Sequence, residues 1–146
     1  MDEPKQENLH KEIDLIQGVI ARMSQNAYYT KGWSVSLIAA VLAFGKDNLQ
    51  TILQTPVLLF ILLLVWTSFW YLDAYFLRSE QAYRKLYNYV IRHSADAQRV
   101  RYSLDAGQYR SQTPSEWRLM VSLSLRVFYG IPMLMMLVAF IRSIIC

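Results

Sequence analysis

Apolar residues fall into long blocks along this chain instead of recurring at one helical or strand spacing throughout. The longest block covers residues 56–77, and its only strongly polar member is Asp73. At a rise of ~1.5 Å per residue, a helix of that length extends ~33 Å and crosses a hydrocarbon core of ~30 Å. Pro56 stands where the first turn of a helix tolerates proline, with Thr55 as the expected N-cap. This block is predicted to be a transmembrane helix.

Two further apolar blocks flank the first. Residues 127–145 are apolar except for Arg142 near their end, and they are long enough for a second crossing. The block before Phe44 is short if it begins at Trp33, which would suit a re-entrant segment. Extended back to Ala27 it reaches spanning length, with Lys31 near one end, where its ammonium group can reach the headgroups. We favour a full span over residues 27–45.

The distribution of basic residues sets the orientation of the three spans. Residues 78–118 carry eight arginines and lysines, whereas the connection 46–55 carries only Lys46. Under the positive-inside rule the long basic segment is cytoplasmic and the short connection lies outside. The N-terminus is then cytoplasmic and the C-terminus lies outside. Five aromatic residues are expected at or near the interface, as aromatic residues often are: Trp33, Trp66, Trp70, Tyr71 and Tyr75.

A heptad-like stripe of apolar residues precedes the first span, and another follows the second span. Such spacings of three and four residues are typical of helices that pack together. One helix approaches the membrane and the other leaves it, so we expect them to pack antiparallel, stripe on stripe. Their surface exceeds what one such pair needs, so the stripes are also candidate contacts between subunits. This candidate oligomer stripe comprises Leu9, Ile13, Ile16, Ile20, Tyr83, Leu86 and Val90. The spacing of its second half continues through Ala97 and Val100 to Leu104, with His93 in the missing place, and we expect one long helix from about Pro56 to the mid-90s.

The predicted fold is an all-α membrane protein with three transmembrane helices and a helical cytoplasmic part. Further along, Thr113 and Glu116 resemble a capping box around Pro114, which predicts that the last helix begins at Pro114 and runs into the third span. The expected organisation is a cytoplasmic amphipathic helix over 1–26, a first span over 27–45, an outer loop over 46–55, a second span over 56–77, a cytoplasmic helical segment over 78–126 and a third span over 127–145.

Two groups of residues inside the spans have both a structural and a functional interpretation. Asp73 is an ionisable group in an apolar block, which is costly and often marks an ion pathway; alternatively it forms a structural ion pair with Lys31 or Arg126. A small-xxx-small pattern in the first span lets helices approach closely, either within the chain or between subunits. Its members are Ser36, Ala39, Ala40 and Ala43.

Motifs for catalysis or metal binding are missing from the sequence. The two histidines, His10 and His93, stand in no metal-binding spacing, and there is no phosphate-binding glycine loop or nucleophile elbow. We therefore expect neither an enzyme nor a cofactor. The basic cytoplasmic segment could contact a ribonucleoprotein, or its charge could simply reflect topology and attraction to anionic lipid. The tyrosines interleaved with its basic residues are Tyr83, Tyr87, Tyr89, Tyr102 and Tyr109.

Several segments resemble a group of small bacterial inner-membrane proteins with three spans. The residues that carry this resemblance lie in 26–34, 70–78, 83–87 and 128–130. In size and architecture the chain is also similar to membrane effectors of anti-phage systems, those of retrons, of cyclic-nucleotide signalling and of type VI-B CRISPR accessories. The Arg-x4–6-His motif of the type VI-B accessory is missing before His93, so ribonuclease activity is not implied.

The resemblance implies a bacterial inner-membrane protein that forms homo-oligomers and compromises the membrane when triggered. A pore would need several copies, because three spans cannot enclose an aqueous path. The trigger would be a cytoplasmic protein or ribonucleoprotein, and no specific nucleic-acid site is expected. The alternative is a membrane anchor whose helical cytoplasmic part recruits a partner.

Overall fold

The fold is entirely helical over the residues that the computed structural model describes, 3–96 and 98–145, and these contain no strand. The chain forms three long helices joined by short ones. Their order is α1 (Glu3–Gly45), η1 (Lys46–Asn48), α2 (Leu49–Gln54), α3 (Pro56–Arg92), α4 (Gly107–Arg110), α5 (Glu116–Met120) and α6 (Leu123–Ile145).

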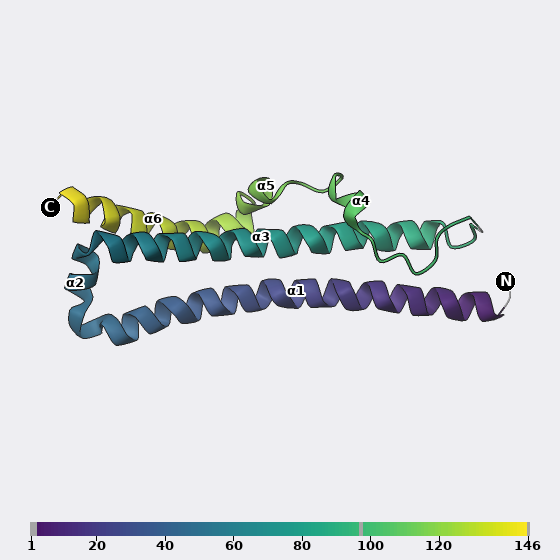
Figure 1. Ribbon diagram of the computed structural model, residues 1–146, viewed down its shortest axis with the longest axis horizontal. Coiled ribbons are helices and arrows are strands. Elements are labelled where there is room, and N and C mark those ends of the chain that lie inside the picture. Colours follow the sequence, from purple (N-terminus) through teal and green to yellow (C-terminus); the bar gives the residue numbers. More distant parts are fainter. Residues whose placement is uncertain (1–2, 97, 146) are drawn as a thin grey trace.

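The long helices lie side by side along one axis (Figure 1). Helix α1 runs antiparallel to α3, and α6 lies against the first part of α3, where it also runs antiparallel to it. The short helix α2 turns the chain between α1 and α3 and reaches α6. Within the described residues α1 and α6 both pack on α3 but not on each other. The two ends of the chain lie at opposite ends of the long axis.

Helix α3 is the central element, and its sequence explains its length. Pro56 occupies its first turn, and no glycine or further proline interrupts the 37 residues to Arg92. It ends at His93, whose backbone N–H donates to the carbonyl of Tyr89 at 3.0 Å. At ~1.5 Å per residue α3 is ~55 Å long, well beyond a bilayer core of ~30 Å. More than two fifths of the helix therefore projects beyond any membrane that its first part crosses.

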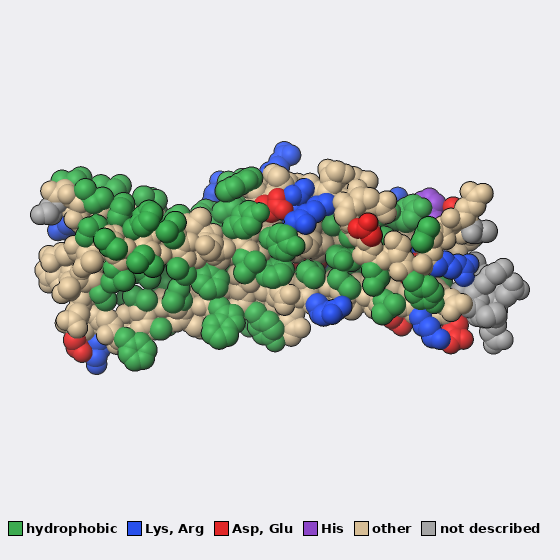
Figure 2. All heavy atoms as spheres, in the orientation of Figure 1, with side chains coloured by type: hydrophobic (Ala, Val, Ile, Leu, Met, Phe, Trp, Pro, Cys, Tyr) green, Lys and Arg blue, Asp and Glu red, His purple; other side chains and the backbone are tan. Residues whose placement is uncertain are grey.

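Two helices of the described chain, α3 and α6, are long and apolar enough to cross a membrane. Helix α1 contains no stretch of comparable length and hydropathy, because Lys31 and several less apolar residues stand in its apolar half, so the expected first span is not shown by composition. Figure 2 shows hydrophobic side chains over the half of the molecule that holds α2 and α6, and more of the charged side chains toward the other end. Most of α6 is exposed in the single chain, as a lipid-facing helix would be.

Both apolar stripes pack against each other within one chain. Ile16, Leu86 and Val90 are at most 3% exposed and form one buried cluster, bordered by the half-buried Leu9, Ile13, Ile20 and Tyr83. This is the antiparallel, stripe-on-stripe packing expected from the periodicity. Because the chain turns back on itself at α2, each stripe is covered by the other stripe of the same chain. We therefore withdraw these seven residues as candidate contacts between subunits.

Helix α3 ends at Arg92, close to the end in the mid-90s that the sequence predicts. The apolar spacing beyond it does not continue as a helix, since residues 93–96 and 98–106 form turns and irregular backbone and Ala97 lies outside the described residues. Val100 is 75% exposed, and Leu104 reaches the buried cluster from a loop. Hydrogen bonds from Arg99 and Tyr102 to Glu12 of α1 hold this loop.

The expected helix start at Pro114 is wrong. Helix α5 begins at Glu116 after Ser115 and ends at Met120, and α6 begins separately at Leu123. The Thr113 hydroxyl donates to the carbonyl of Arg110 at 2.8 Å and caps no helix. The segment 78–126 is thus one helical extension followed by a largely irregular return to the membrane region.

Candidate functional site

An ion pair joins α1 to α3 inside the apolar half of the molecule. The Lys31 ammonium group donates a hydrogen bond to Oδ1 of Asp73 at 2.8 Å and lies 2.6 Å from Oδ2, without hydrogen-bond geometry to the second oxygen. The Asp73 side chain is 1% exposed, whereas that of Lys31 is 31% exposed. A carboxylate so deeply buried requires a compensating charge. Lys31 supplies it while its stem reaches toward the surface.

The surroundings of this pair are polar but closed. Thr30 and Ser34 are buried beside it, and their hydroxyls donate to backbone carbonyls of α1 at 2.8 Å. The Tyr129 hydroxyl lies at the same place, buried on α6 and close to Asp73 and Ser34. The arrangement joins α1, α3 and α6 at one depth.

Arg126 does not belong to this cluster. It is exposed on α6, and no ion pair of Arg126 is found in the part of the chain that the structure describes. Helix α6 turns Leu125 and Tyr129 toward α3, so the residue after Leu125 points away. Of the two cations considered for Asp73, the structure brings Lys31 to it and leaves Arg126 outside.

Two tryptophans of α3 donate hydrogen bonds to backbone carbonyls of α5 and α6. The Trp66 indole N–H donates to the carbonyl of Tyr129 at 2.9 Å, and that of Trp70 donates to the carbonyl of Met120 at 3.1 Å. The Tyr129 ring lies 5.4 Å from that of Trp66 and 6.0 Å from that of Trp70. Trp66 is only 2% exposed, because its ring packs between the helices and its N–H satisfies a backbone carbonyl within the bundle. Its expected place near the membrane interface stays a prediction.

The small residues of the first apolar block form an uncovered face of α1. Ser36, Ala39 and Ala43 are exposed, and Ala40 is half-buried. A Cβ atom added at Gly32, one turn earlier, would meet nothing within 4 Å. Packing within the chain therefore does not account for the small-xxx-small pattern. The face is open to another helix or to lipid.

A second ion pair holds the loop after α3 against the N-terminal half of α1. Both terminal nitrogens of Arg99 donate to the carboxylate of Glu12 at 2.7 Å, and the backbone N–H of Tyr102 adds a third bond at 2.9 Å. Tyr102 adopts a positive φ of 59°, which is uncommon for a residue with a side chain. The hydrogen bonds from Arg99, aided by that from Tyr102, hold the pKa of Glu12 below its usual value against the effect of burial.

A third set of ion pairs fixes the segment before α5. The Arg78 guanidinium donates to Glu116 at 2.5 Å, to the Thr113 hydroxyl at 3.2 Å and to the carbonyl of Arg110 at 2.9 Å. Arg110 also donates to Glu116 at 2.9 Å. These contacts explain why the expected capping box does not form, since the Glu116 carboxylate and the Thr113 hydroxyl have partners on α3.

Sequence reasoning missed the Glu12–Arg99 ion pair and the tryptophan contacts. Glu12 lies three residues after Leu9 and one before Ile13, so its helical position beside the apolar stripe was a usable signal of burial. Arg99 carries no comparable signal, because it is one of eight basic residues in its segment. Its pairing with Glu12 joins positions 87 residues apart and follows only from the fold.

Three of the five tyrosines of the basic segment pack inward, whereas Tyr102 is 43% exposed. Tyr83, Tyr87 and Tyr109 border the buried cluster of α1 and α3, and the Tyr87 hydroxyl accepts a bond from Gln17 at 3.3 Å. Stacking platforms for nucleic-acid bases need exposed aromatic faces, which these three do not offer. Over the described residues no group of three or more His, Cys, Asp or Glu side chains could hold a metal ion.

No protein-family model, curated protein or solved structure matches this chain. The geometry of its own residues is therefore the basis for a functional interpretation.

Proposed function

We propose that this protein crosses the membrane three times, with residues 27–45 as the first span. Two observations support residues 27–45 as a crossing in addition to those of α3 and α6. The Lys31–Asp73 contact places Lys31 at the depth of the α3 residues near the end of the second span, and α2 returns the chain from Gly45 to Pro56. Residues 27–45 extend ~27 Å as a helix, close to a bilayer core of ~30 Å. The basic residues after α3 then favour a cytoplasmic N-terminus and an outer C-terminus, in a bacterial inner membrane.

The proposed activity is that of a non-enzymatic, oligomeric effector that perturbs or perforates this membrane. The uncovered face of Ser36, Ala39 and Ala43 is the observation that carries the proposal. Helices associate in lipid through small residues that allow close backbone approach, and nothing in the single chain covers these. A pore needs several copies, and this face is where they would meet. The role in anti-phage defence is supported by the resemblance in size and architecture.

The cytoplasmic part would receive the trigger, a protein or ribonucleoprotein. It is a packed antiparallel helix pair with its loop held by the Glu12–Arg99 ion pair. Binding of a partner at the loop would be felt by α1, which continues without interruption into the first span. A continuous helix transmits a displacement at one end to the other, so assembly in the membrane could respond to an event in the cytoplasm.

The proposal is tested by filling the small-residue face. Ala39→Phe should leave the fold intact, because the site is exposed, and should lower the oligomer mass in detergent. Leu134→Phe is the matched control, since Leu134 is 65% exposed on α6. In cells that express each form at equal levels, the wild type and the control should collapse the membrane potential reported by a dye, and Ala39→Phe should not. A wild type that is monomeric in mild detergent yet depolarises cells would contradict the assembly proposal.

A membrane anchor is the second candidate, and the rigidity of the cytoplasmic part favours it. Three ion-paired contacts and a buried apolar cluster give this part a fixed surface, as a docking platform would need. An anchor would leave growth and membrane potential unchanged at any expression level. It would instead retain a cytoplasmic partner in the membrane fraction, and Glu12→Gln would release that partner while Ala39→Phe would not.

A further inference from the structure

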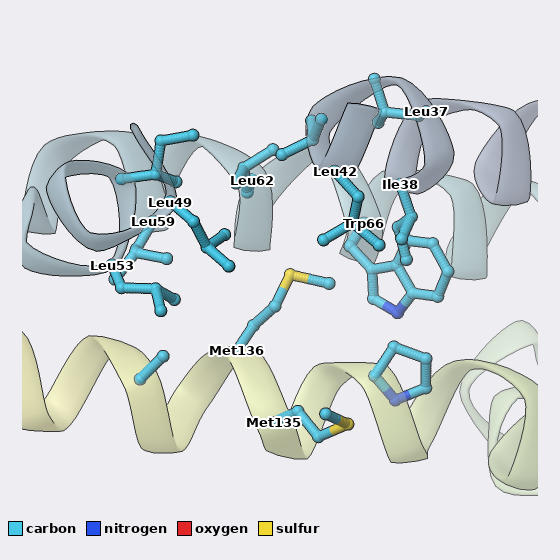
Figure 3. A pocket seen from close by; sticks show the side chains of 14 residues that line it. Leu37, Ile38, Leu42, Leu49, Leu53, Leu59, Leu62, Trp66, Met135 and Met136 are labelled. Carbon is cyan, nitrogen blue, oxygen red and sulfur yellow. The ribbon is translucent and has the colours of Figure 1, made fainter. Parts of the chain in front are cut away.

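A cavity of about 380 Å³ lies between the helices at the end of the molecule where α2 turns the chain (Figure 3). It exists because α1 and α6 both pack on α3 but not on each other, and α2 closes the gap between them from the end. Four helices line the cavity, and each contributes a residue such as Leu42 of α1, Ile52 of α2, Leu59 of α3 or Met136 of α6. Its volume is within the ~300–1,000 Å³ of common ligand pockets.

The cavity offers its occupant no hydrogen bond. All 14 side chains that line it are apolar, apart from the indole of Trp66. That indole N–H already donates to the carbonyl of Tyr129. A stable water needs about two to four polar partners, so water is a poor occupant. A hydrocarbon chain is the ligand that matches such a lining in size and chemistry.

A polar hollow adjoins the cavity at the same end. It measures about 1140 Å³ and shares Leu49, Leu53, Met135 and Ala139 with the apolar cavity. The cations Lys46 and Arg142 line it together with the amides of Gln50 and Gln54 and one acid, Asp47. Neither cation forms an ion pair with any of the described residues. The hollow therefore carries a net positive charge beside a purely apolar space.

Helix α2 is built as the boundary between these two spaces. Leu49, Ile52 and Leu53 line the apolar cavity, whereas Gln50 and Gln54 line only the polar hollow. This short helix thus has one apolar and one polar face, as a helix lying at the membrane interface has. At Gly45, an added Cβ would lie 2.5 Å from Cδ1 of Ile52, so the absence of a side chain lets α2 fold closely onto α1.

We propose that this double site binds an anionic phospholipid of the surrounding bilayer. One acyl chain enters the cavity between α1 and α6, and the phosphate lies between Lys46 and Arg142. The amides of Gln50 and Gln54 are placed to donate to the remaining headgroup and ester oxygens. Charge complementarity selects the headgroup, and the apolar lining requires a chain attached to it. The site depends on the embedding of α3 and α6 in a membrane and not on oligomer or pore formation.

The test uses the full chain in mild detergent, to which phosphatidylglycerol or phosphatidylcholine with the same acyl chains is added. Native mass spectrometry then measures lipid occupancy. With ~1 kcal/mol per basic residue near an anionic surface, two cations give a preference for phosphatidylglycerol of about 10- to 30-fold. Lys46→Gln with Arg142→Gln should abolish the preference and keep the weaker binding of phosphatidylcholine. Arg92→Gln with Arg118→Gln, which removes two exposed cations elsewhere, should keep it.

The acyl-chain part is tested separately by Ala139→Phe, which fills the cavity and should lower the occupancy of both lipids. Its thermal unfolding in lipid-free detergent reports whether the fold is kept, and Leu134→Phe is the matched control. Equal binding of both lipids by the wild type would overturn the proposal. So would full competition by inorganic phosphate or glycerol phosphate, which would make the polar hollow a site for a free anion. Because Ala39→Phe alters assembly and not this cavity, failure here is distinguishable from failure of the oligomeric effector.

Discussion

The buried carboxylate of Asp73 depends on one ammonium group for its compensation. Lys31→Met leaves that charge alone and should cost about 3–5 kcal/mol of stability, whereas Asp73→Asn leaves a lysine that can extend to the headgroups and should cost about 1 kcal/mol. The double substitution should therefore be more stable than Lys31→Met alone. Thermal unfolding of the purified protein in detergent measures this cycle.

Arg126→Met is the control for that cycle, because Arg126 is exposed and lies outside the cluster. Its effect should add to that of Asp73→Asn without coupling. A coupling of Asp73 to Arg126 and none to Lys31 would contradict the geometry and restore the other pairing that the sequence allowed.

Glu12 makes the loop after α3 sensitive to acid. The pKa of Glu12 is lowered from 4.5 by the bonds from Arg99, so folding favours its ionised form. The stabilisation is complete above about pH 4.5 and is lost as the pH falls through the lowered pKa. A nitroxide on Val100→Cys, in a Cys146→Ser background, should be immobile at neutral pH and become mobile as the pH falls below 4.5 and through the lowered pKa of Glu12. Val100 is 75% exposed, so the label should not disturb the loop.

Glu12→Gln should leave that nitroxide mobile at every pH. Glu80→Gln should behave like the wild type, because Glu80 pairs only with Arg84 one turn away on its own helix. Immobile spectra at pH 3 in the wild type, or at neutral pH in Glu12→Gln, would show that other contacts hold the loop.

Among the elements, the pair formed by α1 and α3 owes its packing to the apolar stripes. Leu86 is 3% exposed in the cluster, so Leu86→Ala should destabilise the protein by about 2–5 kcal/mol. It should leave the oligomer mass unchanged, because the stripe faces inward in each subunit. Ile91→Ala, at a site 44% exposed on the same helix, should have little effect on either quantity. A lower mass without a loss of stability in Leu86→Ala would return the stripe to the subunit interface.

The periodicity of apolar residues predicted the long helices. The loop after α3 and the start of α5 depend on long-range polar contacts, which periodicity does not predict. The start of α3 at Pro56 and its continuation well past the apolar block follow from its apolar spacing and from the absence of glycine and further proline, whereas its end at Arg92 does not. The path of residues 93–106 depends on Glu12, and the start of α5 depends on Arg78. Glu12 and Arg78 are distant in the sequence from the segments that they hold, so no local sequence pattern predicts these contacts. Asp73 and Lys31 were recognisable as isolated charges in apolar blocks, but the choice of Lys31 over Arg126 needed the packing of α6.

For the small and aromatic residues of the apolar helices, too, part of the arrangement is predictable from the sequence and part depends on the fold. The uncovered Ala39 and Ala43 were recognisable by spacing, yet only the fold shows that no helix of the same chain covers them. The inward position of Trp66 follows from a carbonyl on α6, which no property of α3 reveals. The cavity beside Trp66 is a consequence of how three helices meet, and its lining comes from four separate elements.

The two ends of the whole molecule differ, and this difference predicts its orientation in a membrane. Its two ends lie at opposite ends of the long axis, and α2 lies at the same end as the C-terminus. Single cysteines in a Cys146→Ser background can test this at three exposed sites, Leu15, Asn48 and Ala95. With three spans and a cytoplasmic N-terminus, an impermeant maleimide should label only Asn48→Cys in intact spheroplasts. All three should react after permeabilisation.

Each alternative gives a different labelling pattern in that experiment. If residues 27–45 did not cross, Leu15→Cys and Asn48→Cys would react from the same side. If the orientation were inverted, Leu15→Cys and Ala95→Cys would react in intact spheroplasts and Asn48→Cys would not. The Lys31–Asp73 pair makes the first alternative costly, because it ties α1 to α3 at the depth of the membrane region. The eight basic residues after α3 oppose the second, since inversion would translocate all of them. Labelling of Asn48→Cys alone is therefore the outcome that we expect from the proposed three-span topology and from the charge distribution.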